Sequence, residues 1–429
     1  MQPPTTPSPQ TQLAPDGATA RRIVALLRAL FARIPRSVIV SALAYVPIAI
    51  ASHFRSTSYN NYARLADAIL HGHLWINWPG RIIDAAQFHG RHYSVDAPFP
   101  VLFVLPLALF YGEAANQTLP AMLLGAIDVG LGWILLERLR VARGPRIWLT
   151  LFLFAGTDLW WCAMLGDVWF FAHVCAVGET LLVLIELAGK RRGWLVALLA
   201  VCAFESRSTL ALAVPVYAYL LASGDLARAS TPNPAAVARG PALRSFAIVL
   251  ACGALFWVGY NEALWGRPTD IGHTLYYHQD SWGHATGSPF SIAYLPYQLY
   301  SFFFQSVDIY EWLQVVQWPF FKVDPHGVAL TFTSPALVLA FLAKGRRRLI
   351  AALWVAIALV AGPNFLYYLN GWYQFGMRHA LDFEPFLLVL MGLGVRTHMP
   401  RWGAILCAWS ALMGTWGVWY WDAFFRTGD

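Results

Sequence analysis

Three aspartates have the surroundings that acid–base chemistry needs: Asp84, Asp96 and Asp167. Asp84 and Asp96 lie in one polar stretch, 55–97, between apolar runs, and Asp167 stands in MLGDVWFFAHV. A carboxylate beside apolar surroundings can take a proton from an attacking hydroxyl and so act as a general base. We therefore predict all three as catalytic residues, with Asp96 or Asp84 as the base and Asp167 binding an acceptor or a donor.

Arginines near these carboxylates could hold a phosphate, because the planar guanidinium donates two parallel hydrogen bonds to phosphate oxygens. The run GRHYSVDAPFP, at the end of the polar stretch, carries an arginine, as do two later segments, FESRSTLALAVP and GWYQFGMRHALDFEPFL. The predicted substrate- and phosphate-binding residues are Asn60, Asn61, Arg91, His92, Tyr93, Arg207, Arg378 and His379.

The histidines of the polar stretch raise the question of a metal site. His71 and His73, or His89 and His92, have a spacing that a metal could use, but no HExxH-type helix accompanies them. We predict that they are hydrogen-bonded loop residues and that there is no metal site, and we keep a divalent metal as the less favoured alternative.

Composition identifies the elements that must position these groups. Of 429 residues, 58% are hydrophobic and 12% are charged, whereas about a quarter of the residues of a soluble protein are charged. Lipid offers no partner for an open sheet edge, so the many apolar runs should be helices that cross a membrane. The net charge of +7 is spread over short segments without an aromatic–basic RNA motif, which predicts membrane lipid as a partner and no nucleic acid.

The order of basic, apolar and polar segments along the chain predicts a membrane topology. Residues 1–36 are rich in Pro, Thr and Gln and end in arginines, which indicates a disordered, basic cytoplasmic tail. Residues 37–429 are then expected to be a single helical membrane domain whose basic clusters face the cytoplasm. Three outer loops should converge on the other face, at about 55–118, 261–327 and 369–384.

We predict an all-α polytopic fold with about eleven spans and an outer C-terminus. The run 98–111 is excluded from the spans because it is short and contains Pro98, Pro100 and Pro106, so it should be a juxtamembrane part of the first outer loop. The predicted spans are 37–54, 119–137, 147–164, 168–188, 193–206, 208–222, 243–260, 328–343, 348–368, 380–395 and 402–420.

Five segments together resemble a known family: YNNYARLADAILHGHLWI, GRHYSVDAPFPVLFVLPLALFYG, CAMLGDVWFFA, FESRSTLALAVP and GWYQFGMRHALDFEPFL. The chain resembles the C-type (GT-C) membrane glycosyltransferases, such as bacterial aminoarabinose transferases and protein O-mannosyltransferases. The resemblance implies a long first outer loop with juxtamembrane helices and a catalytic acid near its start. That acid matches Asn60 and Asn61, which are amides, while a second acidic position matches Asp167 and a phosphate-binding arginine matches Arg207 or Arg378.

The resemblance implies transfer of a sugar from a polyprenyl-phosphate donor to an extracytoplasmic lipid, glycan or protein. The donor would be the lipid-linked sugar, no other cofactor is expected, and the location would be the bacterial cytoplasmic (inner) membrane. Two alternatives stay open: a transporter or flippase of lipid-linked sugar, and a catalytically inactive scaffold, which the amides at Asn60 and Asn61 favour. The sequence predicts neither the sugar nor an oligomeric state.

Overall fold

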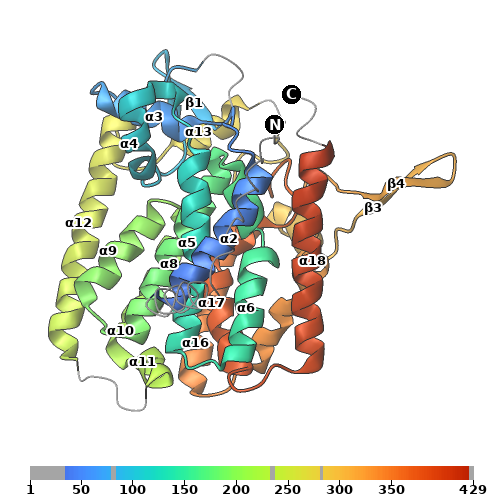
Figure 1. The fold of residues 1–429 in the computed structure, drawn as a ribbon. Coiled ribbons are helices and arrows are strands. Elements are labelled where there is room, and N and C mark those ends of the chain that lie inside the picture. Colours follow the sequence, from blue (N-terminus) through green and yellow to red (C-terminus); the bar gives the residue numbers. More distant parts are fainter. Residues whose placement is uncertain (1–33, 79–83, 232–236, 281–283, 425–429) are drawn as a thin grey trace, which may run out of the picture.

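The computed structural model describes residues 34–78, 84–231, 237–280 and 284–424. The predicted tail, 1–36, therefore lies almost wholly outside the described residues. Long helices stand side by side, and shorter elements gather at one end (Figure 1). We call this the loop end; it carries α3 (Asn61–Leu70), α4 (Val101–Tyr111), α13 (Gly272–Gln279) and a β-hairpin.

Helices make up most of the described chain. The first half contains α2 (Arg36–Ser52), η1 (Gly112–Ala114), α5 (Thr118–Arg138), α6 (Arg143–Ala155), α7 (Leu159–Leu165), α8 (Val168–Ala188), α9 (Gly193–Phe204), η2 (Ser208–Ala213) and α10 (Val214–Ser223). The second half contains α11 (Asp225–Ser230), α12 (Arg239–Trp265), η3 (Ile292–Tyr294), α14 (Leu295–Phe303), α15 (Leu330–Thr333), η4 (Pro335–Leu342), α16 (Arg347–Leu366), η5 (Arg378–Asp382), α17 (Glu384–Gly394) and α18 (Arg401–Phe424).

Length and apolar composition support a membrane protein. Among the described residues, four helices, α5, α8, α12 and α16, are long and apolar enough to cross a bilayer, and α6 with α7 makes a fifth if this pair, bent by 42°, is one span. Helical segments occupy each of the eleven predicted ranges, but several are shorter than a bilayer requires. Eleven crossings therefore stay a prediction.

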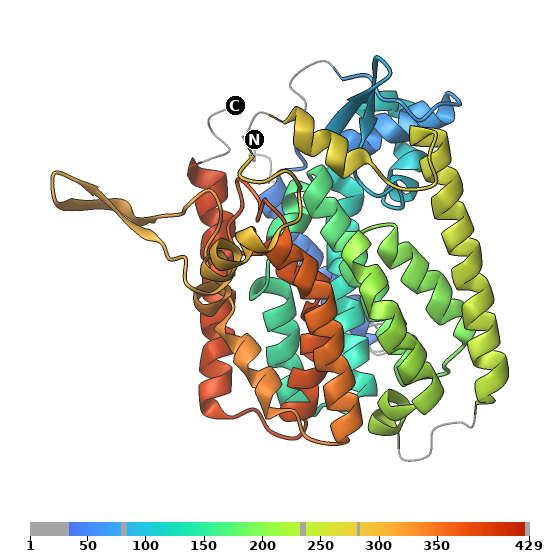
Figure 2. The same cartoon turned by 180° about the vertical axis from the view of Figure 1, so that it is seen from behind.

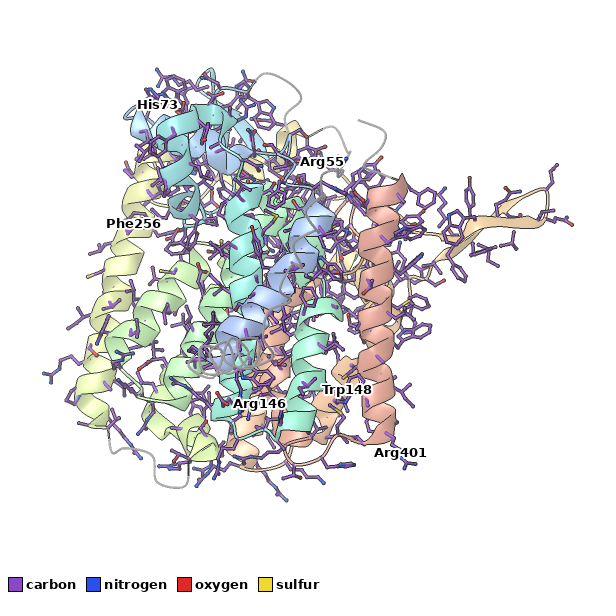
Figure 3. All side chains as sticks on the ribbon, in the orientation of Figure 1. Arg55, His73, Arg146, Trp148, Phe256 and Arg401 are labelled. Atoms are coloured by element: carbon purple, nitrogen blue, oxygen red, sulfur yellow. The ribbon has the colours of Figure 1, made fainter. Side chains whose placement is uncertain are left out.

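Burial separates the inner helices from the outer ones. The apolar window of α8 is 89% buried and that of α12 only 17% buried. Figures 1 and 2 agree, since α12 stands at one edge of the bundle beside α9. The exposed surface of α12 includes Ile248, Leu255 and Phe256, and Figure 3 shows Phe256 at this edge. A continuous apolar surface of this kind is unfavourable in water and favourable against lipid.

The proline-rich run forms a short helix at the loop end, as Figure 1 shows for α4 beside α3. α4 contains Pro106 and spans only Val101–Tyr111, which is too short for a straight crossing of about 30 Å. Figure 3 shows Arg55 and His73 at this end of the bundle, and Arg146 and Arg401 towards the other. The predicted orientation in the membrane depends on the larger number of basic residues at the end opposite the loop end.

Two β-hairpins differ from the expectation of a purely helical chain. β1 (Ala85–Phe88) pairs with β2 (Arg91–Ser94), and β3 (Asp308–Trp312) pairs with β4 (Val315–Lys322). His89 and Gly90 join β1 to β2 with positive φ at both residues, as the favoured two-residue hairpin turn requires. Both hairpins lie within predicted outer loops, 55–118 and 261–327.

Candidate functional site

A pocket of about 80 Å³ opens at the loop end, where three segments meet. The end of β2 and the chain after it supply 94–98, the break between α9 and η2 with its flanking residues supplies 204–208, and the last turns of α12 supply the third wall. Ala172 on α8, Asp270 before α13 and His273 in its first turn complete the lining. Its charged or titratable residues are Asp96, Glu205, Arg207, Tyr260, Asp270 and His273.

The break after α9 brings Glu205 and Arg207 to the pocket. α9 ends at Phe204, and Arg207 has an extended backbone, with φ −143° and ψ 109°, before η2 begins. The backbone N–H of Phe99 donates to the carbonyl oxygen of Glu205 over 2.9 Å, so the first predicted outer loop is tied to this break. The Oε1 atom of Glu205 is buried without a hydrogen-bond partner among the described residues, which leaves an acceptor for a ligand.

Asp96 follows β2 and lines the pocket directly. Its Oδ2 accepts a hydrogen bond from the Ser94 hydroxyl over 3.2 Å. Burial raises the pKa of Asp96 to about 6, against the lowering effects of His273, of the Ser94 hydrogen bond and of Arg207. At neutral pH this carboxyl is therefore ionised and able to accept a proton.

Asp84 lies beside Asp96 without lining the pocket. It precedes β1 with φ 49°, and its carbonyl oxygen accepts hydrogen bonds from the Val95 N–H over 3.1 Å and from the Asn61 amide over 3.3 Å. Burial and the charge of Asp96 raise the pKa of Asp84 to about 8. Two neighbouring carboxyls thus differ in charge at neutral pH, with Asp84 protonated and Asp96 ionised.

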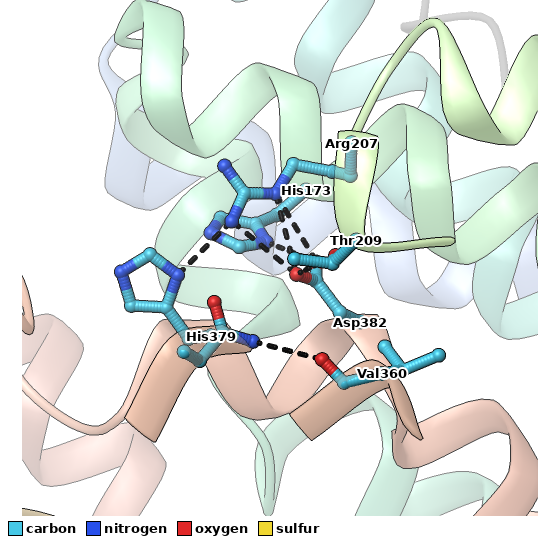
Figure 4. Close-up of polar contacts among 7 residues, drawn as sticks. His173, Arg207, Thr209, Val360, His379 and Asp382 are labelled. Atoms are coloured by element: carbon cyan, nitrogen blue, oxygen red, sulfur yellow. Dashed lines mark hydrogen bonds and ion pairs between the residues drawn. The ribbon is translucent and has the colours of Figure 1, made fainter. Parts of the chain in front are cut away.

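Arg207 is held by a buried carboxylate (Figure 4). Its Nε lies 3.3 Å from each carboxylate oxygen of Asp382, and its Nη2 lies 3.0 Å from His379 Nδ1. Asp382 also contacts His173 Nδ1 over 2.8 Å and accepts a hydrogen bond from the Thr209 hydroxyl over 3.0 Å. Three elements, α8, η2 and η5, are therefore connected through one carboxylate, which fixes the direction of Arg207.

Arg378 lies deeper, against aromatic rings. Its guanidinium carbon is 5.2 Å from the ring centroid of Phe170 and 5.9 Å from that of Trp169, and its Nη1 donates to Gln374 Oε1 over 2.7 Å. Burial lowers the pKa of Arg378 to about 10, so it remains cationic at neutral pH. Arg378 does not line the pocket, but its Nε is buried without a hydrogen-bond partner among the described residues.

Asp167 occupies a different position from the other two predicted carboxylates. It is the residue before α8, where it accepts a hydrogen bond from the Thr57 hydroxyl. The next residue, Val168, donates its N–H to the carbonyl oxygen of Tyr59 over 3.1 Å. Asp167 therefore joins the first predicted outer loop to the start of α8 and does not line the pocket.

Arg91, His92 and Tyr93 belong to the scaffold of the first hairpin. Arg91 is exposed and lies 5.0 Å above the ring of Trp75, and His92 forms a bridge with Ile76. Tyr93 packs against Trp265, with ring centroids 5.4 Å apart. These contacts attach β2 to residues 75–76 and, through Tyr93, to α12, so the three residues support the pocket from outside its lining.

Asn60 and Asn61 make structural contacts at the start of α3. The Asn60 amide donates to the Glu113 carbonyl oxygen over 3.0 Å, and its Oδ1 accepts from Arg64 Nε over 2.9 Å. Asn61 is fully buried and donates to the Asp84 carbonyl oxygen. The amide of Asn61 thus helps to position the carboxyl of Asp84 beside that of Asp96, because it is hydrogen-bonded to the Asp84 backbone.

Sequence reasoning missed His173 and the pair Asp270–His273. Asp270 accepts from the Gly272 N–H over 2.7 Å and lies 3.3 Å from His273 Nδ1. Burial lowers the pKa of His273, but the hydrogen bond and charge of Asp270 outweigh it, so the pKa lies above its usual range. The i,i+3 spacing of Asp270 and His273 in the sequence could have indicated their pairing. His173 could have been noticed as a single ionisable residue within an apolar run.

Among the described residues, no group of three or more His, Cys, Asp or Glu side chains is arranged to hold a metal ion. The absence of a metal site stays a prediction of the sequence. No protein-family model, no curated protein and no solved structure matches this chain. The likeness to C-type glycosyltransferases is therefore an expectation from the quoted segments.

Proposed function

We propose that the protein is a membrane glycosyltransferase that moves a sugar from a polyprenyl-phosphate donor to an extracytoplasmic acceptor. One observation carries the proposal: Asp96 and Arg207 line the same pocket, so a base and a phosphate-binding cation are available together. The loop end would face outwards, because the basic residues that favour the cytoplasm are concentrated at the other end.

In this mechanism the acceptor hydroxyl attacks the anomeric carbon of the sugar while Asp96 takes the hydroxyl proton. The bond between the anomeric carbon and the phosphate oxygen breaks, and the phosphate keeps the electron pair. Arg207 stabilises the added negative charge on the leaving phosphate. The products are the glycosylated acceptor and polyprenyl phosphate, and a single displacement inverts the anomeric carbon.

The pKa values favour Asp96 over Asp84 as the base. A general base must be deprotonated at the working pH, and the pKa of Asp96 is about 6 while that of Asp84 is about 8. Asp84 in its protonated form would instead donate a hydrogen bond. Asp167, before α8, and Arg378, at the start of η5, would bind the acceptor or the donor beside the pocket.

The size of the pocket suits the phosphate rather than the whole donor. Sites for small molecules usually measure about 300–1,000 Å³, and this pocket measures about 80 Å³. The sugar would then lie at its mouth. The polyprenyl chain would follow α12, because Trp257 and Leu264 line the pocket while Leu255 and Phe256 form an exposed apolar surface on the same helix.

An inactive scaffold is the second candidate, and Asn60 and Asn61 favour it. Both amides replace the acid that the family resemblance implies, and both are engaged in hydrogen bonds that a carboxylate could not donate. A scaffold would bind a lipid-linked sugar without transferring it. Substitution of Asp96 would then leave biological complementation unchanged.

The test uses full-length protein in lipid nanodiscs and a radiolabelled panel of polyprenyl-phosphate pentoses and hexoses. Release of polyprenyl phosphate and transfer to a lipid or glycan acceptor are measured for the wild type, Asp96→Asn and Asp308→Asn. Asp308 is an exposed residue of β3 and serves as the matched control. We expect loss of turnover in Asp96→Asn alone; no turnover by the wild type with any donor, or equal turnover in both variants, would contradict the proposal.

A further inference from the structure

A second and larger pocket lies at the end of the bundle opposite the loop end. Its volume is about 490 Å³, and it is bounded by α10, α11 and the starts of α12 and α16. Figure 1 shows α10, α11 and α16 at that end, with the start of α12 at the edge of the bundle. The lining residues are Tyr219, Ser223, Asp225, Arg228, Arg239, Arg346, Arg347 and Arg348. We call this the arginine pocket.

Among the described lining residues, the one carboxylate, Asp225, already has partners. Asp225 is buried, and its Oδ2 accepts a hydrogen bond from the Tyr219 hydroxyl over 3.0 Å. Its Oδ1 lies 3.1 Å from Arg228 and 3.7 Å from Arg346. One negative charge thus holds two guanidinium groups in place and does not balance the remaining arginines.

Three arginines of the lining have no such partner. Among the described residues, Arg239, Arg347 and Arg348 show neither an ion pair nor a side-chain hydrogen bond. A further arginine, Arg191, is buried behind the pocket; burial, Arg228 and Arg239 lower its pKa. Positive charge is therefore concentrated here, and an anion would relieve the repulsion.

Several other basic residues at this end have partners within the protein. Arg192 makes an ion pair with Glu186 at 2.9 Å, and Arg146 makes one with Glu137. Arg396 donates to a backbone carbonyl oxygen over 2.6 Å. The usual enrichment of arginine on the cytoplasmic side accounts for these residues, but it does not require a hollow in which unpaired arginines face one another.

We propose that the arginine pocket binds a phosphate-bearing ligand, at a site separate from the candidate transferase site. Guanidinium groups bind phosphate in bidentate geometry, and the volume falls within the range of small-molecule sites. Asp225 orders Arg228 and Arg346, and Arg239, Arg347 and Arg348 supply the free donors. The phosphate could belong to an anionic lipid headgroup, which basic pockets between membrane helices bind, or to a soluble phosphate compound.

The experiment measures ligands retained by full-length protein in native mass spectrometry. Two probes separate the sources: phosphatidic acid against phosphatidylcholine of equal chain length, and inorganic pyrophosphate. The double variant Arg347→Gln/Arg348→Gln is compared with Arg401→Gln. Arg401 is an exposed arginine at the same end and lies outside the pocket lining, so this control removes charge without touching the pocket.

We expect the wild type to retain more phosphatidic acid than phosphatidylcholine. The ratio of the two retained lipids should fall at least tenfold in the double variant, because each arginine near a membrane surface changes the affinity for an anionic lipid by about fivefold. Arg347→Lys/Arg348→Lys should regain part of it, which shows that the loss is not misfolding. Saturable binding of pyrophosphate alone, lost in the same variant, would assign the site to a soluble phosphate. No preference for either probe, or an equal loss in Arg401→Gln, would overturn the proposal. Neither outcome depends on transferase activity.

Discussion

Arg207 contacts both carboxylate oxygens of Asp382, with Nε 3.3 Å from each. The two residues are far apart in the sequence, and they join the break after α9 to η5 (Figure 4). The Asp382 side chain is 0% exposed and that of Arg207 is 21% exposed. The carboxylate therefore lies inside the bundle, while the guanidinium extends from it to the wall of the pocket.

Asp382→Ala should destabilise the fold. Removal of one partner leaves Arg207 without its buried counter-charge, which typically costs about 3–5 kcal/mol. Thermal unfolding in detergent would show a clearly lower midpoint. Asp422→Ala is the matched control, because Asp422 pairs with His53 at the surface and exposed pairs contribute only about 0–1 kcal/mol. Equal midpoints for the two variants would contradict this account of the ion pair.

Asp96→Asn and Asp84→Asn should differ in their effect on transfer near neutral pH. Loss of a general base lowers the rate by about 10²–10⁴-fold, so Asp96→Asn should be nearly inactive. Asp84 is expected to be protonated, and asparagine resembles a neutral carboxyl, so Asp84→Asn should retain activity within about tenfold. Initial rates at saturating donor distinguish them, and the reverse order of activities would assign the base to Asp84.

The pH profile should follow the carboxyl of Asp96. Its pKa is about 6, and only the ionised form accepts a proton, so the rate should rise as the pH increases through this value. Ser94→Ala removes a hydrogen bond that stabilises the ionised form. The pKa should therefore increase, and the rising limb should move to higher pH. A profile that does not move, or that moves to lower pH, would exclude Asp96 as the titrating group.

Asn61→Asp should not restore an acid to the site. The Asn61 amide donates to the Asp84 carbonyl oxygen and is fully buried. A carboxylate there would place an acceptor against an acceptor, which costs about 1–3 kcal/mol in the stability of the fold. Thermal unfolding and the transfer rate should both fall relative to the wild type. A rate above that of the wild type would show that this position takes part in the chemistry.

Much of the helical framework could be predicted from the sequence. Long apolar runs such as those of α5, α8 and α12 have one physical solution in lipid, and the prolines before and within α4 limit that helix to a short segment. The β-hairpins were not predicted, because β1 and β2 are four residues each and their pairing depends on the turn at His89 and Gly90.

Part of the candidate pocket could be anticipated from the sequence, while its function stays a proposal. Asp96 and Arg207 were among the candidates and line one pocket, because loop polarity and an interrupted apolar run are both visible in sequence. The partnership of Arg207 with His173 and Asp382 was not predicted. It depends on how α8, η2 and η5 pack together, and no local pattern encodes a contact between segments so distant in the chain.

The most direct test of the central claim is a structure of the full-length protein in a lipid nanodisc with polyprenyl phosphate bound. A phosphate oxygen is expected within hydrogen-bonding distance of the Arg207 guanidinium, and the lipid chain is expected along α12, with Asp96 facing the space for the sugar. A phosphate bound away from the pocket formed by 94–98 and 204–208 would contradict this expectation.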